Sequence, residues 1–186
     1  MRDFARRVRQ ELDAPLGQRG FEYAGGLYRR AHSSGLEHRI GFGNKGYDTN
    51  VFEVLLGFGH TQIPSDGFIL ARYFTGGSLA ATRKGLACPN VTVLRTRLQR
   101  LVTEFSRVVE PFFDSVRSSL ELAEALHDDP TADYLRGHLF LRGGDKQRAR
   151  AELVAYLARL PGIVSAEHPK LREVKELLAE FERSRG

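Results

Sequence analysis

Hydrophobic positions change their spacing twice along the chain, and each change marks a different kind of structure. From residue 2 to residue 18 an apolar side chain recurs at every fourth position, which predicts an amphipathic helix. These side chains are Phe4, Val8, Leu12 and Leu16. From residue 21 to residue 74, short aromatic and aliphatic runs alternate with glycine turns, as in strands. A helical spacing returns from Asn90, so the order of elements predicts an α+β protein.

The middle part of the chain predicts a small antiparallel sheet of four to five strands. Its segments are residues 21–23, 27–30, 36–42, 50–58 and 68–74. The connections between them are too short for crossover helices, so neighbouring strands should form a meander. Segment 50–58 is apolar on both faces, which favours a central strand, whereas Glu37 and Arg39 predict one solvated face for segment 36–42. Residues 76–90 show no periodicity and are expected to form a loop.

Helices are expected to fill the rest of the chain. Apolar positions three and four apart predict a helix from Asn90 that kinks or breaks at Pro111, because proline cannot donate a backbone hydrogen bond. Ser118 and Glu121 have the spacing of a capping box and predict the next helix start. A helical hairpin is expected over residues 130–161, and a last helix from Pro169. The expected domains are residues 1–127, an α+β domain, and residues 128–186, a helical extension.

The composition is typical of a globular protein without a membrane-spanning segment. The 186 residues are 41% hydrophobic and include 12 phenylalanines, enough for a substantial core. No apolar run approaches the roughly 18 residues that a membrane helix needs, and the basic N-terminus lacks the apolar stretch of a secretory signal. With Cys88 as the one cysteine, no internal disulfide can form. We therefore expect a cytoplasmic protein with no membrane partner.

Basic charge is concentrated in the first half of the chain. The formal net charge is +5; residues 1–92 contain 12 Lys and Arg against 8 Asp and Glu, while residues 93–186 contain 16 against 15. Four arginines lie close to the N-terminus: Arg2, Arg6, Arg7 and Arg9. Such a cluster is either a solvated helix face or a contact for nucleic-acid phosphates. The second interpretation gives an alternative function, that of a nucleic-acid-associated protein.

The sequence contains no clear catalytic or metal-binding pattern. Residues 41–46 match the glycine spacing of a dinucleotide-binding loop, but a strand rather than a helix should follow them, so we interpret them as a hairpin turn. The histidines lack metal-ligand spacing; His32 and His38 could converge across a turn, without an evident third ligand. We expect no catalytic residue, no metal and no cofactor. An enzyme with its site between sheet and helices is a further alternative.

Residues 130–161 resemble a single helical hairpin of the tetratricopeptide type. The first helix is expected to begin at Asp129-Pro130 and to end at Gly143-Gly144. Five residues stand at the small, aromatic and proline positions of the repeat: Gly137, Phe140, Ala149, Leu153 and Pro161. Asp133 and Arg136 replace its usual Trp and Leu. Because such repeats form surfaces that bind other proteins, the resemblance implies binding rather than catalysis.

One face of the first hairpin helix combines polar and aromatic side chains. Tyr134, His138 and Arg142 recur at intervals of four residues and therefore lie on one side of the helix. If the hairpin works as in the repeat family, this face lines the concave surface, and Arg142 pairs with a carboxylate of a protein partner. The alternative is an ordinary solvated face. These three residues are the predicted partner-binding residues.

Residues 1–127 resemble an uncharacterised bacterial family, a domain of unknown function of similar length. The resemblance rests on the N-terminal helix leading to Gly20-Phe21, on Leu27–Arg30, on the hairpin from Leu36–Phe42 into Asn50–Val54, and on the late helix with Glu110–Asp114. Proteins of this kind are similar to the small α+β immunity and accessory proteins of bacterial toxin systems, which act by binding a partner. The resemblance implies a non-catalytic, protein-binding function and assigns no site residue.

Overall fold

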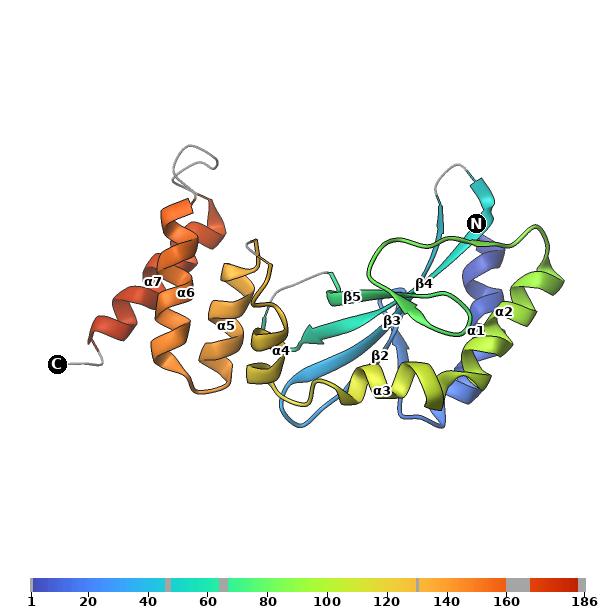
Figure 1. Cartoon of the computed structure of the whole chain (residues 1–186), viewed down its shortest axis with the longest axis horizontal. Helices are drawn as coiled ribbons and strands as arrows, with labels where there is room; N and C mark the ends of the chain where they lie inside the picture. The colour runs from blue at the N-terminus through green and yellow to red at the C-terminus, as the bar shows by residue number, and fades with distance from the viewer. Residues whose placement is uncertain (1, 46–47, 64–66, 130, 160–167, 184–186) are drawn as a thin grey trace. The chain divides into compact units, whose positions relative to one another are not determined.

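The computed structural model describes residues 2–45, 48–63, 67–129, 131–159 and 168–183 of the chain. Residue contacts divide the chain into Met1–Arg117 and Ser118–Gly186, which we call unit 1 and unit 2 (Figure 1). The boundary lies at residue 117 rather than 127, because helix α4 (Ser119–Ala125) packs against helix α5 (Asp133–Arg142) of unit 2.

Unit 1 is built around one antiparallel sheet in which consecutive strands lie side by side (Figure 1). The five main strands are β1 (Glu22–Ala24), β2 (Leu27–Ala31), β3 (Leu36–Lys45), β4 (Asp48–His60) and β5 (Ile69–Phe74). They confirm the predicted meander, and β4 lies between β3 and β5 as expected for a central strand. Its apolar side chains explain this position, because a central strand is covered on both faces.

The sheet has more strands than the sequence predicts. Over the described residues it contains seven, so the expected count of four to five was too low. The additional strands β6 (Leu79–Ala80) and β7 (Leu86–Ala87) lie in the segment expected to be a loop, and pair with β5 and β4. Each is two residues long, so it shows no alternation of side chains that could mark it as a strand in the sequence.

Residues 41–45, which were expected to belong to a hairpin turn, continue a strand. Residues Gly41–Lys45 belong to β3, and their pairing with β4 shifts between Asn44 and Lys45. A strand follows, as expected, and not the helix that a dinucleotide-binding loop requires. Residues 46 and 47, where the predicted turn would lie, are outside the described residues.

Helix α1 (Arg2–Gly17) confirms the predicted N-terminal helix and packs on one face of the sheet. Its buried apolar stripe consists of Val8, Leu12 and Leu16. The ring of Phe4 meets that of Phe52 on β4, with 5.8 Å between centroids. The Tyr28 hydroxyl donates a hydrogen bond of 2.6 Å to Asp13, so the buried phenol is satisfied by the helix that covers it.

The long helix predicted from Asn90 changes its winding before Pro111. Helix α2 (Val91–Thr103) is followed by a π-helical turn over Phe105–Val109 and by α3 (Glu110–Asp114). The wider turn ends directly before α3, where Pro111 occupies the first turn. The α-helical winding that starts at Val91 is therefore interrupted over residues 104–109, shortly before Pro111, in agreement with the expected break.

Aromatic rings join the π-helical turn and α3 to the sheet. Phe21 lies 5.9 Å from both Phe105 and Phe113, measured between ring centroids. His38 of β3 stacks on Phe113 at 4.4 Å, and Phe58 of β4 meets the same ring at 5.8 Å. The residues of β3 and β4 on the side of His38 and Phe58 therefore face the helices, and their neighbours in sequence face away.

Unit 2 consists of helices (Figure 1). Helices α5 and α6 (Lys146–Arg159) form the predicted hairpin, and α7 (Pro169–Arg183) follows. Gly144 has a φ of 85° after the end of α5, and the Asp145 carboxylate accepts the backbone N–H of Arg148 and caps α6. None of the helices in the described parts of either unit is long and apolar enough to cross a membrane.

The start of α5 differs from the prediction. The helix begins at Asp133 rather than after Asp129. The Asp129 carboxylate instead accepts hydrogen bonds from the backbone N–H and the hydroxyl of Thr131, at 2.8 and 2.7 Å. It caps a turn before the helix, which an Asp does as readily as it caps a helix. Pro130 and Pro161 of the predicted hairpin lie outside the described residues.

Candidate functional site

The face of the sheet that points away from α1 and α3 has four glycines on its two longest strands. Gly41 and Gly43 of β3 and Gly57 and Gly59 of β4 occupy this side. In the register of the two strands, Gly41 pairs with Leu55, and Gly43 pairs with Glu53. We call this side of β3 and β4 the glycine face. Because these positions lack a Cβ, other segments of the chain can approach the backbone closely.

Glu37 and Arg39 lie on the glycine face and are buried, which corrects the prediction of a solvated face. Arg39 donates to Glu37 Oε2 from Nε at 3.0 Å and from Nη2 at 2.6 Å, and from Nη1 to the carbonyl of Gly67 at 2.7 Å. Its guanidinium occupies the space where a Cβ at Gly59 would lie. The segment before β5 thus covers this end of the glycine face. The alternation of polar residues along β3 could not predict this cover, because it comes from another part of the chain.

Beside this covered end, the glycine face forms a pocket of about 300 Å³. Leu27, Gly41, Leu55 and Tyr73 are register partners on four neighbouring strands and line it as a row. Phe68 bounds the pocket, and its ring stands only 2.6 Å from the place of a Cβ at Gly41. The pocket therefore exists because β3 has no side chain at Gly41, and the rings of Phe68 and Tyr73 form part of its walls.

A buried carboxylate and an exposed guanidinium stand at the end of the pocket. The side chain of Glu53 is 7% exposed and that of Arg83 is 55% exposed. Arg83 Nε lies 2.6 Å from Oε1 and 2.8 Å from Oε2 of Glu53. This hydrogen bond with Glu53 raises the pKa of the Arg83 guanidinium.

The pocket combines apolar and aromatic walls with one ion pair. Among the described residues that line it, those with polar groups are Glu53, Arg83 and Tyr73, and none is His, Cys, Ser or Thr. These residues therefore offer neither a Ser–His nor a Cys–His pair for nucleophilic catalysis. No group of three or more His, Cys, Asp or Glu residues in the described ranges is arranged to hold a metal ion.

Sequence reasoning missed both charged residues of the pocket. One signal was available, because Glu53 lies within a segment that is otherwise apolar on both faces. A carboxylate in a buried strand requires a cationic or hydrogen-bonding partner, so Glu53 could have been recognised as a candidate site residue. The partner itself, Arg83, was not recognisable, since it lies 30 residues further along the chain in a segment without periodicity.

The predicted partner-binding residues of α5 do not form one exposed face. Tyr134 and His138 are 5% and 3% exposed, while Arg142 is exposed. The Tyr134 hydroxyl donates to Glu173 of α7 at 2.8 Å, and His138 Nε2 lies 3.6 Å from the same carboxylate. Burial lowers the pKa of His138. Tyr134 and His138 are adjacent as predicted, with ring centroids 4.5 Å apart, but α7 occupies the side where a partner was expected.

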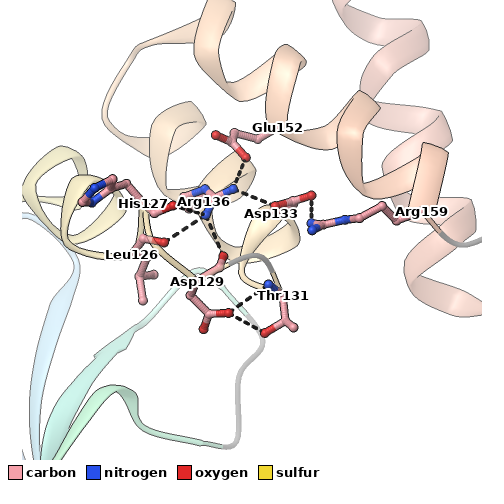
Figure 2. A network of polar contacts seen from close by, with 8 residues as sticks. All are labelled: Leu126, His127, Asp129, Thr131, Asp133, Arg136, Glu152 and Arg159. Carbon is pink, nitrogen blue, oxygen red and sulfur yellow. Dashed lines mark hydrogen bonds and ion pairs between the residues drawn. The ribbon is translucent and has the colours of Figure 1, made fainter. Parts of the chain in front are cut away.

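The residues that replace the Trp and Leu of the tetratricopeptide signature form a buried ion pair (Figure 2). Arg136 Nη2 donates to Asp133 at 2.6 Å and to Glu152 of α6 at 2.8 Å. Arg136 Nη1 donates to the carbonyls of Leu126 and Asp129 at 2.9 and 2.8 Å. One guanidinium thus joins α6 to the chain between α4 and α5, and its neighbourhood is a structural centre of unit 2.

The N-terminal arginines do not act as one cluster. Arg6 and Arg7 line a groove of about 240 Å³ with Arg95 of α2. Arg9 instead pairs with Asp13 at 3.1 Å and lies over the ring of Tyr23. The side chain of Arg2 is outside the described part of the chain. Spacing on a helix therefore places Arg7 and Arg9 in different grooves of α1, while Arg6 lines both.

The histidines that were expected to converge do so without a ligand set. The rings of His32 and His38 are 5.1 Å apart. His38 Nδ1, however, accepts hydrogen bonds from Nε and Nη2 of Arg30 at 3.2 and 3.0 Å. An acceptor that faces a guanidinium is unavailable to a cation, so His38 is a buried residue of the core, whereas His32 beside it is exposed.

Comparison of the chain with protein-family models, with curated proteins and with solved structures gives no match. The fold and the pocket described above therefore provide the basis for a functional assignment.

Proposed function

We propose that this protein is a non-catalytic binding protein that recognises a protein partner through the pocket on the glycine face. The observation that carries the proposal is the pocket itself, with apolar walls from Leu27, Leu55 and Phe68 and the ion pair of Glu53 and Arg83 at one end. The immunity and accessory proteins that residues 1–127 resemble act in this general way, by holding a partner.

The size and composition of the pocket favour a protein side chain over a larger ligand. Its volume of about 300 Å³ is at the lower limit for sites of small organic ligands. A side chain inserted from a partner surface needs less room, and buried anchors of this kind dominate the energetics of protein interfaces. The described lining contains no Ser–His or Cys–His pair, and its carboxylate, Glu53, is held in an ion pair with Arg83, which favours binding over turnover of the bound group.

Filling the pocket is expected to abolish capture of the partner. Leu27→Arg places a long side chain in the pocket from β2, and Val154→Arg makes the same change at a residue of α6 that is 44% exposed. With the tagged full chain as bait in extract of the native host, quantitative mass spectrometry should show at least a roughly tenfold loss of a specific partner for Leu27→Arg. Val154→Arg should recover it like the wild type.

Two results would count against this assignment. Equal recovery of partners by Leu27→Arg and the wild type, with both folded by circular dichroism, removes the pocket from the interface. Loss of the partner in an Arg142→Ala variant, with normal recovery by Leu27→Arg, would move the interface to the exposed end of α5.

A second function is favoured by the distribution of charge. Residues 1–117 contain 17 Lys and Arg against 11 Asp and Glu, whereas residues 118–186 contain 11 against 12. Helix α2 carries three arginines and no acidic residue. These are Arg95, Arg97 and Arg100. We infer from this excess that unit 1 is the part of the chain that would contact nucleic-acid phosphates.

Nucleic-acid binding through α2 is expected to depend on salt in proportion to the number of arginines. Three phosphate contacts give a slope of about −2.7 for log K against log salt, or about a fortyfold loss between 50 and 200 mM. Fluorescence anisotropy of a labelled 20-base-pair duplex measures this slope, and Arg97→Gln with Arg100→Gln should reduce it to about −0.9. Absence of binding at 50 mM salt, or an unchanged slope in the double variant, excludes this function.

A further inference from the structure

We propose that Glu53 is the anchor for a positively charged side chain, Arg or Lys, of the protein partner, and that Arg83 occupies its place in the free chain. The inference rests on the proposed function, since it names the chemistry that the pocket selects. It is carried by three features of the pocket: the burial of Glu53, the position of Arg83 and the character of the walls.

Glu53 has more capacity to accept hydrogen bonds than its surroundings use. An ionised carboxylate offers about four acceptor sites. Within the described part of the chain, the donor that reaches Glu53 is Arg83 Nε, at 2.6 and 2.8 Å from the two oxygens. A carboxylate that is only 7% exposed has also lost most of its water. Further N–H donors from a ligand would therefore meet a desolvated and incompletely paired anion.

Arg83 approaches Glu53 from outside, as a ligand would. It lies between β6 and β7, in a run of five residues that are all exposed, 81–85. More than half of its own side chain is exposed, so water competes for its guanidinium. A long side chain held in this way loses conformational freedom for a weak contact. Arg83 thus neutralises Glu53 in the free chain, and a basic side chain that is more fully buried in the pocket can displace it.

The rest of the pocket suits the stem of a long basic side chain. Leu27 and Leu55 provide apolar contact for methylene groups, and Gly41 between them lets the stem lie against the strand backbone. Phe68 and Tyr73 place aromatic rings at the same pocket, where a cation gains further attraction. A neutral or acidic side chain would leave Glu53 unpaired once it displaced Arg83, so the pocket selects positive charge.

The test uses small mimics of one side chain on the ¹⁵N-labelled full chain. The probes are N-acetyl-arginine amide, N-acetyl-lysine amide and the uncharged N-acetyl-citrulline amide. Binding is followed by the amide shifts of Gly43, Leu55 and Tyr73. Arg83→Gln removes the internal competitor and is expected to bind the arginine probe at least about tenfold more tightly than the wild type. Glu53→Gln should not bind it, and citrulline should not bind to any variant.

Arg107→Gln provides the matched control. Arg107 is another exposed arginine of unit 1 that pairs with a carboxylate, Glu104, at 2.6 Å, but it lies outside this pocket. Its replacement should leave the affinity for the arginine probe unchanged. If Glu53→Gln does not fold, the comparison of arginine and citrulline probes on Arg83→Gln decides the matter alone.

Three outcomes overturn the inference: equal affinity of wild type and Arg83→Gln, equal binding of the citrulline and arginine probes, or binding that survives in folded Glu53→Gln. These results are separable from failure of the proposed function. If Leu27→Arg loses the protein partner while no basic probe binds, the pocket is an interface without a cation anchor. If the basic probe binds while Leu27→Arg keeps its partner, the anchor exists and the proposed interface is wrong.

Discussion

Replacement of Arg136 by Met is expected to lower the free energy of unfolding of unit 2 by about 3–5 kcal/mol, the usual cost of removing one partner from a buried ion pair. The side chain of Arg136 is 11% exposed, and it donates hydrogen bonds to Asp133, to Glu152 and to three backbone carbonyls before α5. Met retains much of the apolar stem but donates nothing. Asp133 keeps its contact with Arg159, whereas the carbonyls are left without this donor.

Hydrogen exchange is the direct measurement, because it reports each unit separately. Amides of α5 and α6 should lose protection in Arg136→Met, while those of β3 and β4 in unit 1 should keep it. Arg142→Met is the matched control: it makes the same change at the exposed C-terminal end of α5. Similar protection in the two variants would show that the network in Figure 2 contributes little to stability.

Acidification from pH 7 to pH 5 is expected to cost about 2 kcal/mol of stability through His38 alone. Burial is the main cause that lowers the pKa of His38 to about 3, and the positive charge of Arg30 and the neighbouring His32 add to it. In the unfolded chain a histidine has a pKa near 6.5. Between these values the unfolded chain binds a proton that the folded chain does not, so stability falls as the pH falls below about 6.5.

A variant that keeps the hydrogen bond without the titration isolates this effect. His38→Asn places an acceptor near the position of Nδ1, where Arg30 donates, and cannot bind a proton in this range. Urea unfolding at pH 7, 6 and 5 should show wild-type stability falling more steeply than that of the variant, by about 2 kcal/mol in total. Parallel curves for the two proteins would mean that His38 has the same pKa in the folded chain as in the unfolded chain.

The glycine face connects the fold to both proposals for the pocket. Four glycines on β3 and β4 leave room that is used in two ways: Arg39 and Phe68 fill one part, and the pocket occupies the other. A strand with ordinary side chains at Gly41 and Gly43 would have no such space. The proposed binding therefore depends on the absence of side chains at these glycines as well as on the carboxylate of Glu53.

Local elements were predictable because the forces that form them act between near neighbours in the chain. The apolar stripe of α1, the five main strands and the cap of α4 by Ser118 all follow from spacing within a few residues. The same local information failed for β6 and β7, since two-residue strands depend on the strand beside them. It also placed the start of α5 too early, because Asp129 has a local partner in Thr131.

The sequence by itself determined the α+β order, the meander, the helical hairpin and the adjacency of Tyr134 and His138. Tertiary structure decided which faces of these elements are open. Tyr134 is covered through Glu173, 39 residues away, and Glu53 meets Arg83 across 30 residues. Periodicity assigns a side chain to a face of its own helix or strand, but burial of that face depends on a distant segment whose approach no local pattern records.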